Sequence, residues 1–238
     1  MSTVSLPPSR PPIVYPDSDG EPMAENTLQF EWIQKITGGL EYLFAHDPNV
    51  FVAGDLFWYP VQGHPETRLA PDALVAFGRP KGHRGSYRQW EEGGIPPQVV
   101  FEVLSPGNRF GEMNAKFNFY QRYGVEEYYL YDPEPARLEL SGFLRHGNDL
   151  IEIEKMDGHV SPRLKVKFEM GEEGLRILRP DGQPFVTFEE LALQKEHEQR
   201  RADEQRERAE LERERADRLQ AELERLRGDA AAPGPAGT

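Results

Sequence analysis

The stretch that decides the fold is residues 99–132, VVFEVLSPGNRFGEMNAKFNFYQRYGVEEYYLYD. It begins with an apolar run rich in β-branched residues, which is typical of a strand buried on both faces. After the turn sequence SPGN, apolar side chains recur at steps of three and four, as on one face of a helix: Phe110, Met113, Phe117 and Tyr120. Gly124 ends this helix, and a second apolar, aromatic strand runs to Asp132. The stretch therefore predicts a β-α-β crossover, which places two parallel strands side by side.

One charge, that of Glu102, interrupts the first of these strands. Burying an unpaired carboxylate costs far more free energy than a neighbouring valine contributes, so Glu102 needs a cation, a hydrogen-bond donor or a place at the sheet rim. The candidate cations are a metal ion and Lys116. A second acid, Asp72, stands at the start of another apolar run, residues 73–77. Two acids and a lysine on adjacent elements predict a site for Mg²⁺, which takes one or two carboxylates, keeps several waters and uses substrate phosphates for the rest.

Each of these residues also has a purely structural interpretation. Asp72 follows a proline, and aspartate is a common turn or cap residue. Lys116 stands four residues after Glu112, so the two are expected to form an ordinary salt pair on a helix surface, worth about 0.3–0.5 kcal/mol. Because Glu102 and Asp72 are expected to lie close to Lys116 and Glu112, the functional interpretation of Lys116 and Glu112 is favoured.

Four motifs carry a resemblance to a known family: PD at residues 71–72, FEVLSP at 101–106, EMNAK at 112–116 and YGVEEYYLYDP at 123–133. From about residue 50 to residue 132 the chain resembles the Uma-type putative restriction endonucleases, a branch of the PD-(D/E)xK nuclease superfamily. The four motifs occur in the order and spacing of the family, which makes the resemblance more specific than a single PD dipeptide.

The resemblance implies an α/β (α+β) fold, with a restriction-endonuclease-like core and a mixed central sheet flanked by helices. It implies that Asp72 and Glu102 bind Mg²⁺ or Mn²⁺ and that Lys116 completes the catalytic set. The lysine departs from the superfamily pattern, because Leu104 stands two residues after Glu102 where that pattern has lysine. Lys116, on the following helix, matches the position of the lysine in this family. Glu112 lies one helical turn before it and is expected to orient its ammonium group or to add a metal ligand.

Two further segments carry candidate site residues. Residues 50–59 are predicted to form one strand with Asp55 inside it, and Asp55 either joins the acidic cluster or marks a bend beside Gly54. Residues 79–97 form a long loop rich in Gly and Pro, and loops of this length are usually functional or disordered. The first half of the loop interleaves basic and aromatic residues without an acid, which suits phosphate contacts and base stacking. The predicted nucleic-acid-binding side chains are Arg79, Lys81, Arg84 and Arg88. The alternative is a solvated flap whose Trp90 packs on the core.

The predicted domain organisation follows changes in composition. Residues 1–25, rich in Pro, Ser and Asp, are expected to form a flexible arm. Residues 26–187 form the nuclease-like domain, which starts with a helix capped by Asn26 or Thr27 and ends in short antiparallel strands that extend the sheet, at 137–143, 149–155, 164–168 and 175–178. Residues 188–228 are expected to form a charged helix, and residues 229–238 a disordered tail.

The charged helix shows a heptad repeat that is only partly apolar. One core position holds Ala202, Ala209, Ala216 and Leu223, and the other holds Gln205, Glu212, Leu219 and Leu226. Because this seam is apolar only near its end, it predicts a helix supported by ion pairs between successive turns, or a weak coiled coil.

Composition limits the possible classes of function. The chain has no cysteine, which excludes disulfides and thiolate metal sites and fits a reducing cytoplasm. No apolar run approaches membrane-spanning length and no basic-then-apolar leader opens the chain, so a soluble cytoplasmic protein without membrane contact is expected.

Of the net charge of −13, −2 falls in residues 191–238 and −11 in residues 1–190. This acidic body argues against tight nonspecific DNA binding but leaves a nuclease possible, since metal ligands are themselves acidic.

The sequence therefore predicts a Mg-dependent endonuclease that hydrolyses phosphodiester bonds, with DNA as the substrate. The resemblance suggests a homodimer in which two chains cut two strands, and the C-terminal helix is a candidate to assist this association. Two alternatives come from other functional classes: a catalytically silent nucleic-acid-binding module that acts through the basic loop, and a scaffold that recruits a partner through its C-terminal helix. A resemblance in fold does not by itself separate these from an enzyme.

Overall fold

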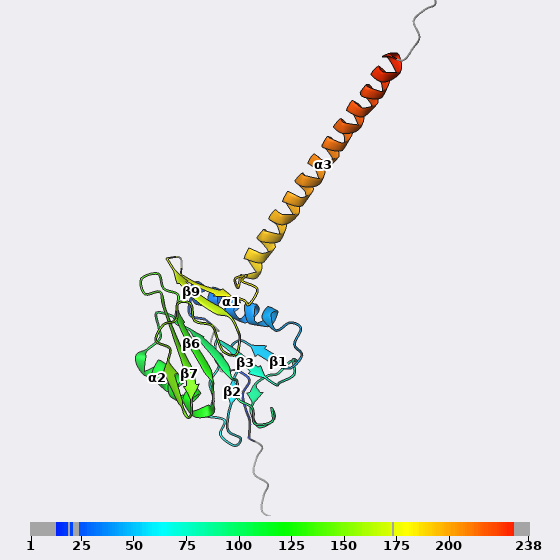
Figure 1. Cartoon of the computed structure of the whole chain (residues 1–238). Coiled ribbons are helices and arrows are strands. Elements are labelled where there is room, and N and C mark those ends of the chain that lie inside the picture. Colours follow the sequence, from blue (N-terminus) through cyan, green and yellow to red (C-terminus); the bar gives the residue numbers. More distant parts are fainter. Residues whose placement is uncertain (1–12, 19, 21–23, 173, 231–238) are drawn as a thin grey trace, which may run out of the picture. The chain divides into compact units, whose positions relative to one another are not determined.

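The computed structural model describes residues 13–18, 20, 24–172 and 174–230, with side chains of the last helix described up to residue 221. The chain divides into two units, Met1–Thr187 and Phe188–Thr238. The first unit contains all the strands and the first two helices, and the second is a single helix followed by the C-terminal residues (Figure 1).

Six strands form the main sheet of the first unit: β1 (Val50–Ala53), β3 (Ala73–Phe77), β5 (Val99–Val103), β6 (Glu127–Asp132), β7 (Glu139–His146) and β8 (Asp149–Glu152). They lie in the order β1-β3-β5-β6-β7-β8. Within this sheet β5 and β6 pair in parallel, and the other neighbours pair antiparallel. Helix α2 (Phe110–Tyr123) connects β5 to β6, so the predicted crossover and the mixed sheet are both confirmed.

Helix α2 ends where the sequence predicts it to end. Gly124 adopts a left-handed conformation with φ of 96°, and its N–H donates to the carbonyl of Tyr120. This conformation costs a glycine little, because a glycine has no Cβ to clash with the following carbonyl. The turn brings the chain directly back into the sheet at β6.

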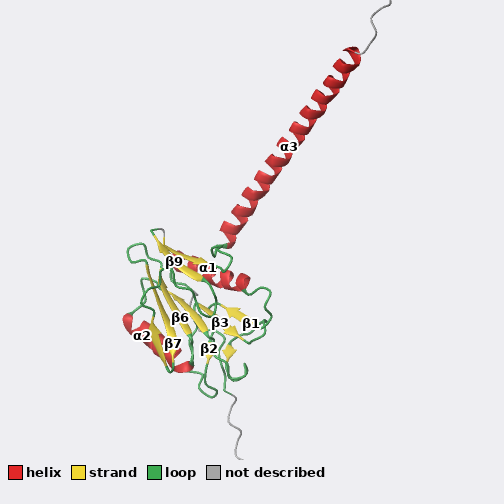
Figure 2. Cartoon of the chain, in the orientation of Figure 1, coloured by secondary structure: helices red, strands yellow, loops and turns green. Residues whose placement is uncertain are grey.

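The central strands β3, β5 and β6 of the main sheet are buried on both faces, and successive residues of these strands belong to different cores. Val99 and Phe101 of β5 pack in one core with helix α1 (Thr27–Leu43), whereas Val100, between them, packs in the other with Tyr120 of α2. Two short strands, β9 (Lys167–Gly171) and β10 (Gly174–Leu178), add apolar side chains to the α1 core. Figure 2 shows α1 and α2 on the two sides of the sheet. By the same alternation, Glu102 faces α2.

The start of α1 follows the sequence prediction. Asn26 is the N-cap, and its side chain accepts a hydrogen bond of 2.8 Å from the backbone N–H of Gln29. Such a cap satisfies one of the backbone donors that the first helical turn leaves without a partner.

Three structural predictions were wrong in detail. Residues 50–59 are not one strand, because Asp55 has a φ of 49° and separates β1 from β2 (Trp58–Tyr59), which pairs in parallel with β4 (Tyr87–Arg88). Strands β9 and β10 pair with each other in a separate sheet instead of extending the main one, because their apolar side chains cover the α1 core. Phe110 is 89% exposed, because it is the first helical residue, ahead of the part of α2 that packs on the sheet.

Part of the segment predicted to be an arm contacts the body. The Tyr59 hydroxyl donates to the carbonyl of Pro16 at 2.5 Å, and Ser86 Oγ donates to Asp17 Oδ1 at 3.0 Å. The backbone N–H of Gly63 donates to the Tyr15 hydroxyl at 2.6 Å. Residues 1–12 and 231–238, which include much of the predicted arm and tail, lie outside the described residues.

The predicted C-terminal helix is present as α3 (Phe188–Ala230). Side chains of opposite charge pair along it, with Arg206 3.9 Å from Asp203 and Arg218 3.8 Å from Glu214. Its described side chains are almost all exposed. The coiled coil stays a prediction, and the side chains of Leu223 and Leu226 lie outside the described residues. Within the described part of the chain, no helix combines the length and the apolar character needed to cross a bilayer.

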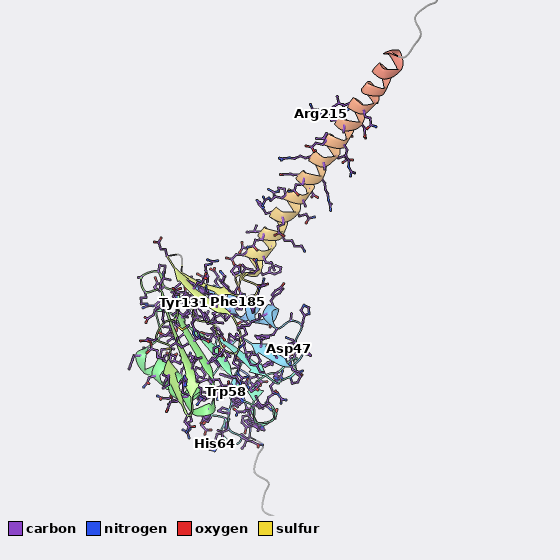
Figure 3. All side chains as sticks on the ribbon, in the orientation of Figure 1. Asp47, Trp58, His64, Tyr131, Phe185 and Arg215 are labelled. Carbon is purple, nitrogen blue, oxygen red and sulfur yellow. The ribbon has the colours of Figure 1, made fainter. Side chains whose placement is uncertain are left out.

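Two adjacent glycines of α1 give a matched test of how closely this helix packs. A Cβ on Gly39 would lie 2.2 Å from the ring of Phe185, whereas a Cβ on Gly38 would meet nothing within 4 Å. Figure 3 labels Phe185. We expect Gly39→Ala to destabilise the protein by about 1–3 kcal/mol, because the buried ring has to shift. Gly38→Ala should stabilise it by about 0.5–1 kcal/mol through helix propensity alone. Urea denaturation measures both, and equal stability of the two variants would contradict the close packing.

Candidate active site

The pairing of β3 with β5 brings the two predicted acids together. Ala73 lies opposite Phe101 and Leu74 opposite Val100, so continuing the same register by one residue sets Asp72 opposite Glu102. Side chains that face each other in this way have Cβ atoms about 4.5–5.5 Å apart. Asp72 Oδ2 also accepts a hydrogen bond of 2.6 Å from the backbone N–H of Val103, the residue after Glu102.

Helix α2 supplies both hydrogen-bond donors to Glu102. Lys116 Nζ lies 2.9 Å from Glu102 Oε2, and the Tyr120 hydroxyl donates to Glu102 Oε1. The two donors are four residues apart, hence on the same helical face. Glu102 is 2% exposed and Lys116 18%, so the ion pair is largely shielded from water. The predicted trio of Asp72, Glu102 and Lys116 is therefore assembled in one place.

The electrostatics of this trio leave a surplus of negative charge. Burial, together with the adjacent Glu102 carboxylate, raises the pKa of Asp72 well above its ordinary value. Burial alone would lower the pKa of Lys116, but attraction to Glu102 outweighs it and the pKa is raised, so the ammonium stays charged. Two buried acids thus share one lysine, and an additional cation would be favourable there.

The two predicted supporting acids lie at the edge of the cluster. Glu112 is 47% exposed, with Oε1 3.9 Å from Lys116 Nζ, so it adds a weak second contact to the ammonium. Asp55 is exposed on the bend after β1, and its backbone N–H donates to the carbonyl of Pro71 at 3.1 Å. The charge of Asp55 also contributes to raising the pKa of Asp72. Asp55 therefore marks a bend, and its supporting role in the acidic cluster stays a prediction.

Three residues at this site were not identified from the sequence. Tyr120 was assigned to an apolar helical face, although its position one turn after Lys116 was a signal. Gln29 is buried on α1, and its Nε2 donates to the carbonyl of Val103 at 2.8 Å. Glu25 accepts a hydrogen bond from the hydroxyl of Ser105. No spacing in the sequence links Gln29 or Glu25 to the acids, because folding brings α1 to the end of β5.

The basic loop is largely paired internally. Arg84 Nε lies 2.5 Å from Glu92 Oε1, and its guanidinium lies over the Phe51 ring at 3.9 Å. Arg79 lies 3.9 Å from the same glutamate, and Arg88 lies 3.6 Å from Glu91 and 4.0 Å from Asp17. Lys81 is exposed, and its ammonium has no ion pair or hydrogen bond within the described residues. The acids in the second half of the loop thus neutralise much of the basic first half.

The donor set suits a hard divalent cation. Asp72 and Glu102 present carboxylate oxygens, and Mg²⁺ is commonly held by one or two carboxylates with waters and phosphates completing an octahedron. A larger protein cage is absent: across the described residues, no group of three or more His, Cys, Asp and Glu side chains is arranged to hold a metal. The two acids fit an ion that is shared with water and substrate.

A family model matches residues 16–158, more than half of the chain. Its description is Uma2, "Putative restriction endonuclease". The chain belongs to this family. The matched segment includes Asp72, Glu102, Lys116 and Tyr120, together with the basic loop. Membership of this family places the protein among the nucleases.

One solved structure similar to this chain is the crystal structure of a putative nuclease belonging to DUF820 from Anabaena variabilis ATCC 29413. The similarity covers 58% of this chain and 72% of that chain, with 11% sequence identity and a TM-score of 0.41. None of the curated proteins compared with this chain matches it.

The raised pKa of Asp72 predicts that its charge costs folding stability. Asp72 binds its proton more tightly in the folded protein than in the unfolded chain. Its protonated form therefore contributes fully to folding stability when the pH is below the pKa of the unfolded chain. This contribution is lost as the pH rises through the pKa of the folded protein. Asp72→Asn keeps an oxygen that accepts from Val103 and removes the repulsion with Glu102. In EDTA we expect the variant to be more stable at pH 8, on the order of 1 kcal/mol.

Thermal unfolding across pH measures this difference. The advantage of Asp72→Asn should be small near pH 4, grow as pH rises and level off above the folded pKa. Added Mg²⁺ should then reduce the difference in stability between Asp72→Asn and the wild type, because it stabilises the wild type. A variant less stable than wild type at pH 8 in EDTA would mean that attraction to Lys116 outweighs repulsion from Glu102.

Proposed function

We propose that this protein is a Mg²⁺- or Mn²⁺-dependent endonuclease that hydrolyses phosphodiester bonds in DNA. The observation that carries the proposal is the buried pair of Asp72 and Glu102 with Lys116 hydrogen-bonded to Glu102. Two hard carboxylates beside a fixed ammonium provide places for a divalent ion and for a phosphate. Family membership supports a nuclease, and the chemistry of these side chains supports the metal.

The roles of the residues follow from their charges. A divalent cation, held by Asp72 and Glu102, would lower the pKa of a bound water and neutralise the phosphate. Lys116 remains an ammonium group and so donates hydrogen bonds instead of accepting a proton. In this role it orients the attacking water or stabilises the negative charge that develops on the phosphate. Glu112 and Asp55 adjust the local charge from the edge of the site.

The decisive variants are Glu102→Gln and Lys116→Arg. Glu102→Gln keeps an oxygen for Tyr120 but removes the charge that the metal needs, so metal-dependent cleavage should fall below detection. Lys116→Arg keeps a cation beside Glu102 but moves the donors, and we expect kcat to fall about 100–1,000-fold. Cleavage of supercoiled and linear DNA in Mg²⁺, Mn²⁺ or EDTA is the measurement.

Glu126→Gln is the matched control for these variants. Glu126 pairs with Arg163 at 2.6 Å and lies outside the acidic cluster, so this variant should cut DNA as the wild type does. DNA binding without cleavage in both wild type and Glu102→Gln would favour the catalytically silent binding module. Cleavage retained in Glu102→Gln would remove Glu102 from the catalytic set.

We propose that the contribution of the basic loop to DNA binding comes mainly from Lys81. Lys81→Ala should weaken binding equally across DNA sequences and leave the folding stability unchanged. It should also reduce the slope of log K against log salt concentration by about one. Arg84→Ala should instead destabilise the protein by about 1–3 kcal/mol, because it leaves the largely buried Glu92 without its closest partner. Fluorescence anisotropy at several salt concentrations separates the two effects. If Arg84→Ala loses more DNA affinity than Lys81→Ala while still folded, Arg84 itself contacts DNA.

A homodimer and a cytoplasmic location complete the proposal. Cutting both strands of a duplex requires two active sites or two successive cuts, and two copies would supply two sites. The heptad repeat of α3 offers one means of association, although its seam is polar over most of its length. The absence of cysteine fits a reducing compartment.

A further inference from the structure

The Glu102 carboxylate is held at both oxygens by one face of α2. Lys116 Nζ binds Oε2 at 2.9 Å, and the hydroxyl of Tyr120 donates to Oε1. A carboxylate has about four lone-pair sites, so one hydrogen bond to each oxygen leaves about two sites for other partners. The two donors therefore define which side of the carboxylate stays available.

The Tyr120 ring is fixed in place by other aromatic rings. It stacks parallel to Trp58 at a centroid distance of 6.4 Å, and it packs against Tyr128 at 5.0 Å. Tyr120 is fully buried. The buried hydroxyl therefore points at Glu102 Oε1 from a fixed ring.

Without the Tyr120 hydroxyl, little would fix the rotation of the carboxylate. The last torsion of a glutamate side chain has broad, shallow preferences, so the group turns easily. Lys116 carries three donor hydrogens and would attract both oxygens toward itself. A carboxylate turned in this way presents fewer lone pairs to an ion shared with Asp72.

We propose that Tyr120 is a positioning residue that orients Glu102 for divalent-metal binding in the cleavage reaction. The inference rests on the proposed function, in which Glu102 holds the metal. Tyr120 acts through Glu102 and is not expected to contact the metal or the DNA. Groups that orient a metal ligand in this way typically change metal affinity 10–100-fold when they are removed.

Tyr128 provides a matched control in the same aromatic cluster. Like Tyr120 it is buried, but within the described residues its hydroxyl has no hydrogen-bond partner. Tyr128→Phe and Tyr120→Phe therefore delete the same atom from neighbouring rings, and only Tyr120→Phe removes a bond to Glu102. The comparison distinguishes the effect of losing the hydrogen bond to Glu102 from the effect of losing a hydroxyl group in this aromatic cluster.

The test titrates Mn²⁺ into the full-length wild type and both variants by isothermal calorimetry, without DNA. Tyr120→Phe should raise the Kd for Mn²⁺ about 10–100-fold, whereas Tyr128→Phe should leave it within about 2-fold. In cleavage assays, a high Mn²⁺ concentration should restore kcat in Tyr120→Phe, which a misfolded site would not allow. Thermal unfolding in EDTA checks that each variant folds.

The outcomes distinguish failure of the inference from failure of the proposed function. If wild type and Tyr120→Phe bind Mn²⁺ equally, the positioning role is wrong while the proposed function stands. If Tyr128→Phe weakens binding as much as Tyr120→Phe does, the hydrogen bond is not the cause and the inference fails. If the wild type neither binds Mn²⁺ nor cuts DNA, the proposed function fails and the inference falls with it.

Discussion

The buried charge of Glu102 is the constraint around which the site is organised. A carboxylate in a strand covered on both faces is tolerated only with close partners, and here Lys116 and Tyr120 of α2 supply them. Both partners lie on the face of α2 that points toward Glu102 in the sheet. The β5-α2-β6 crossover thus serves both packing and chemistry, because the helix that covers one core also carries the cation.

The same arrangement sets folding stability against function. Asp72 adds a second negative charge opposite Glu102, and its raised pKa reports the cost of holding that charge there. If folding stability alone mattered, replacing one of the two acids by a neutral residue would be favourable. In the proposed function a bound cation would offset this cost, and active sites commonly sacrifice stability for chemistry.

Sequence patterns predicted the parts of this fold that depend on local rules. The alternation and helical spacing of residues 99–132 gave the crossover, and Gly124 gave its turn, because each follows from backbone geometry. Motif order and the cost of burying a charge predicted the trio of Asp72, Glu102 and Lys116, and the fold brings these three side chains together. Tyr120 was missed because a tyrosine on an apolar face is usually core. The separate β9–β10 pair was missed because short strands of similar composition do not specify their neighbours.

The spacing of the site along the chain has a consequence for how it assembles. Lys116 and Tyr120 are 14 and 18 residues from Glu102, whereas the bond between Asp72 and Val103 spans 31 residues. Closing the longer loop costs about 0.6 kcal/mol more in chain entropy, since each doubling of length adds that amount. Partly folded chains in which Glu102 already has its ammonium partner are therefore favoured over those in which the two acids meet first. The order of residues along the chain therefore favours folding intermediates in which Glu102 is paired with Lys116 before Asp72 is brought next to it.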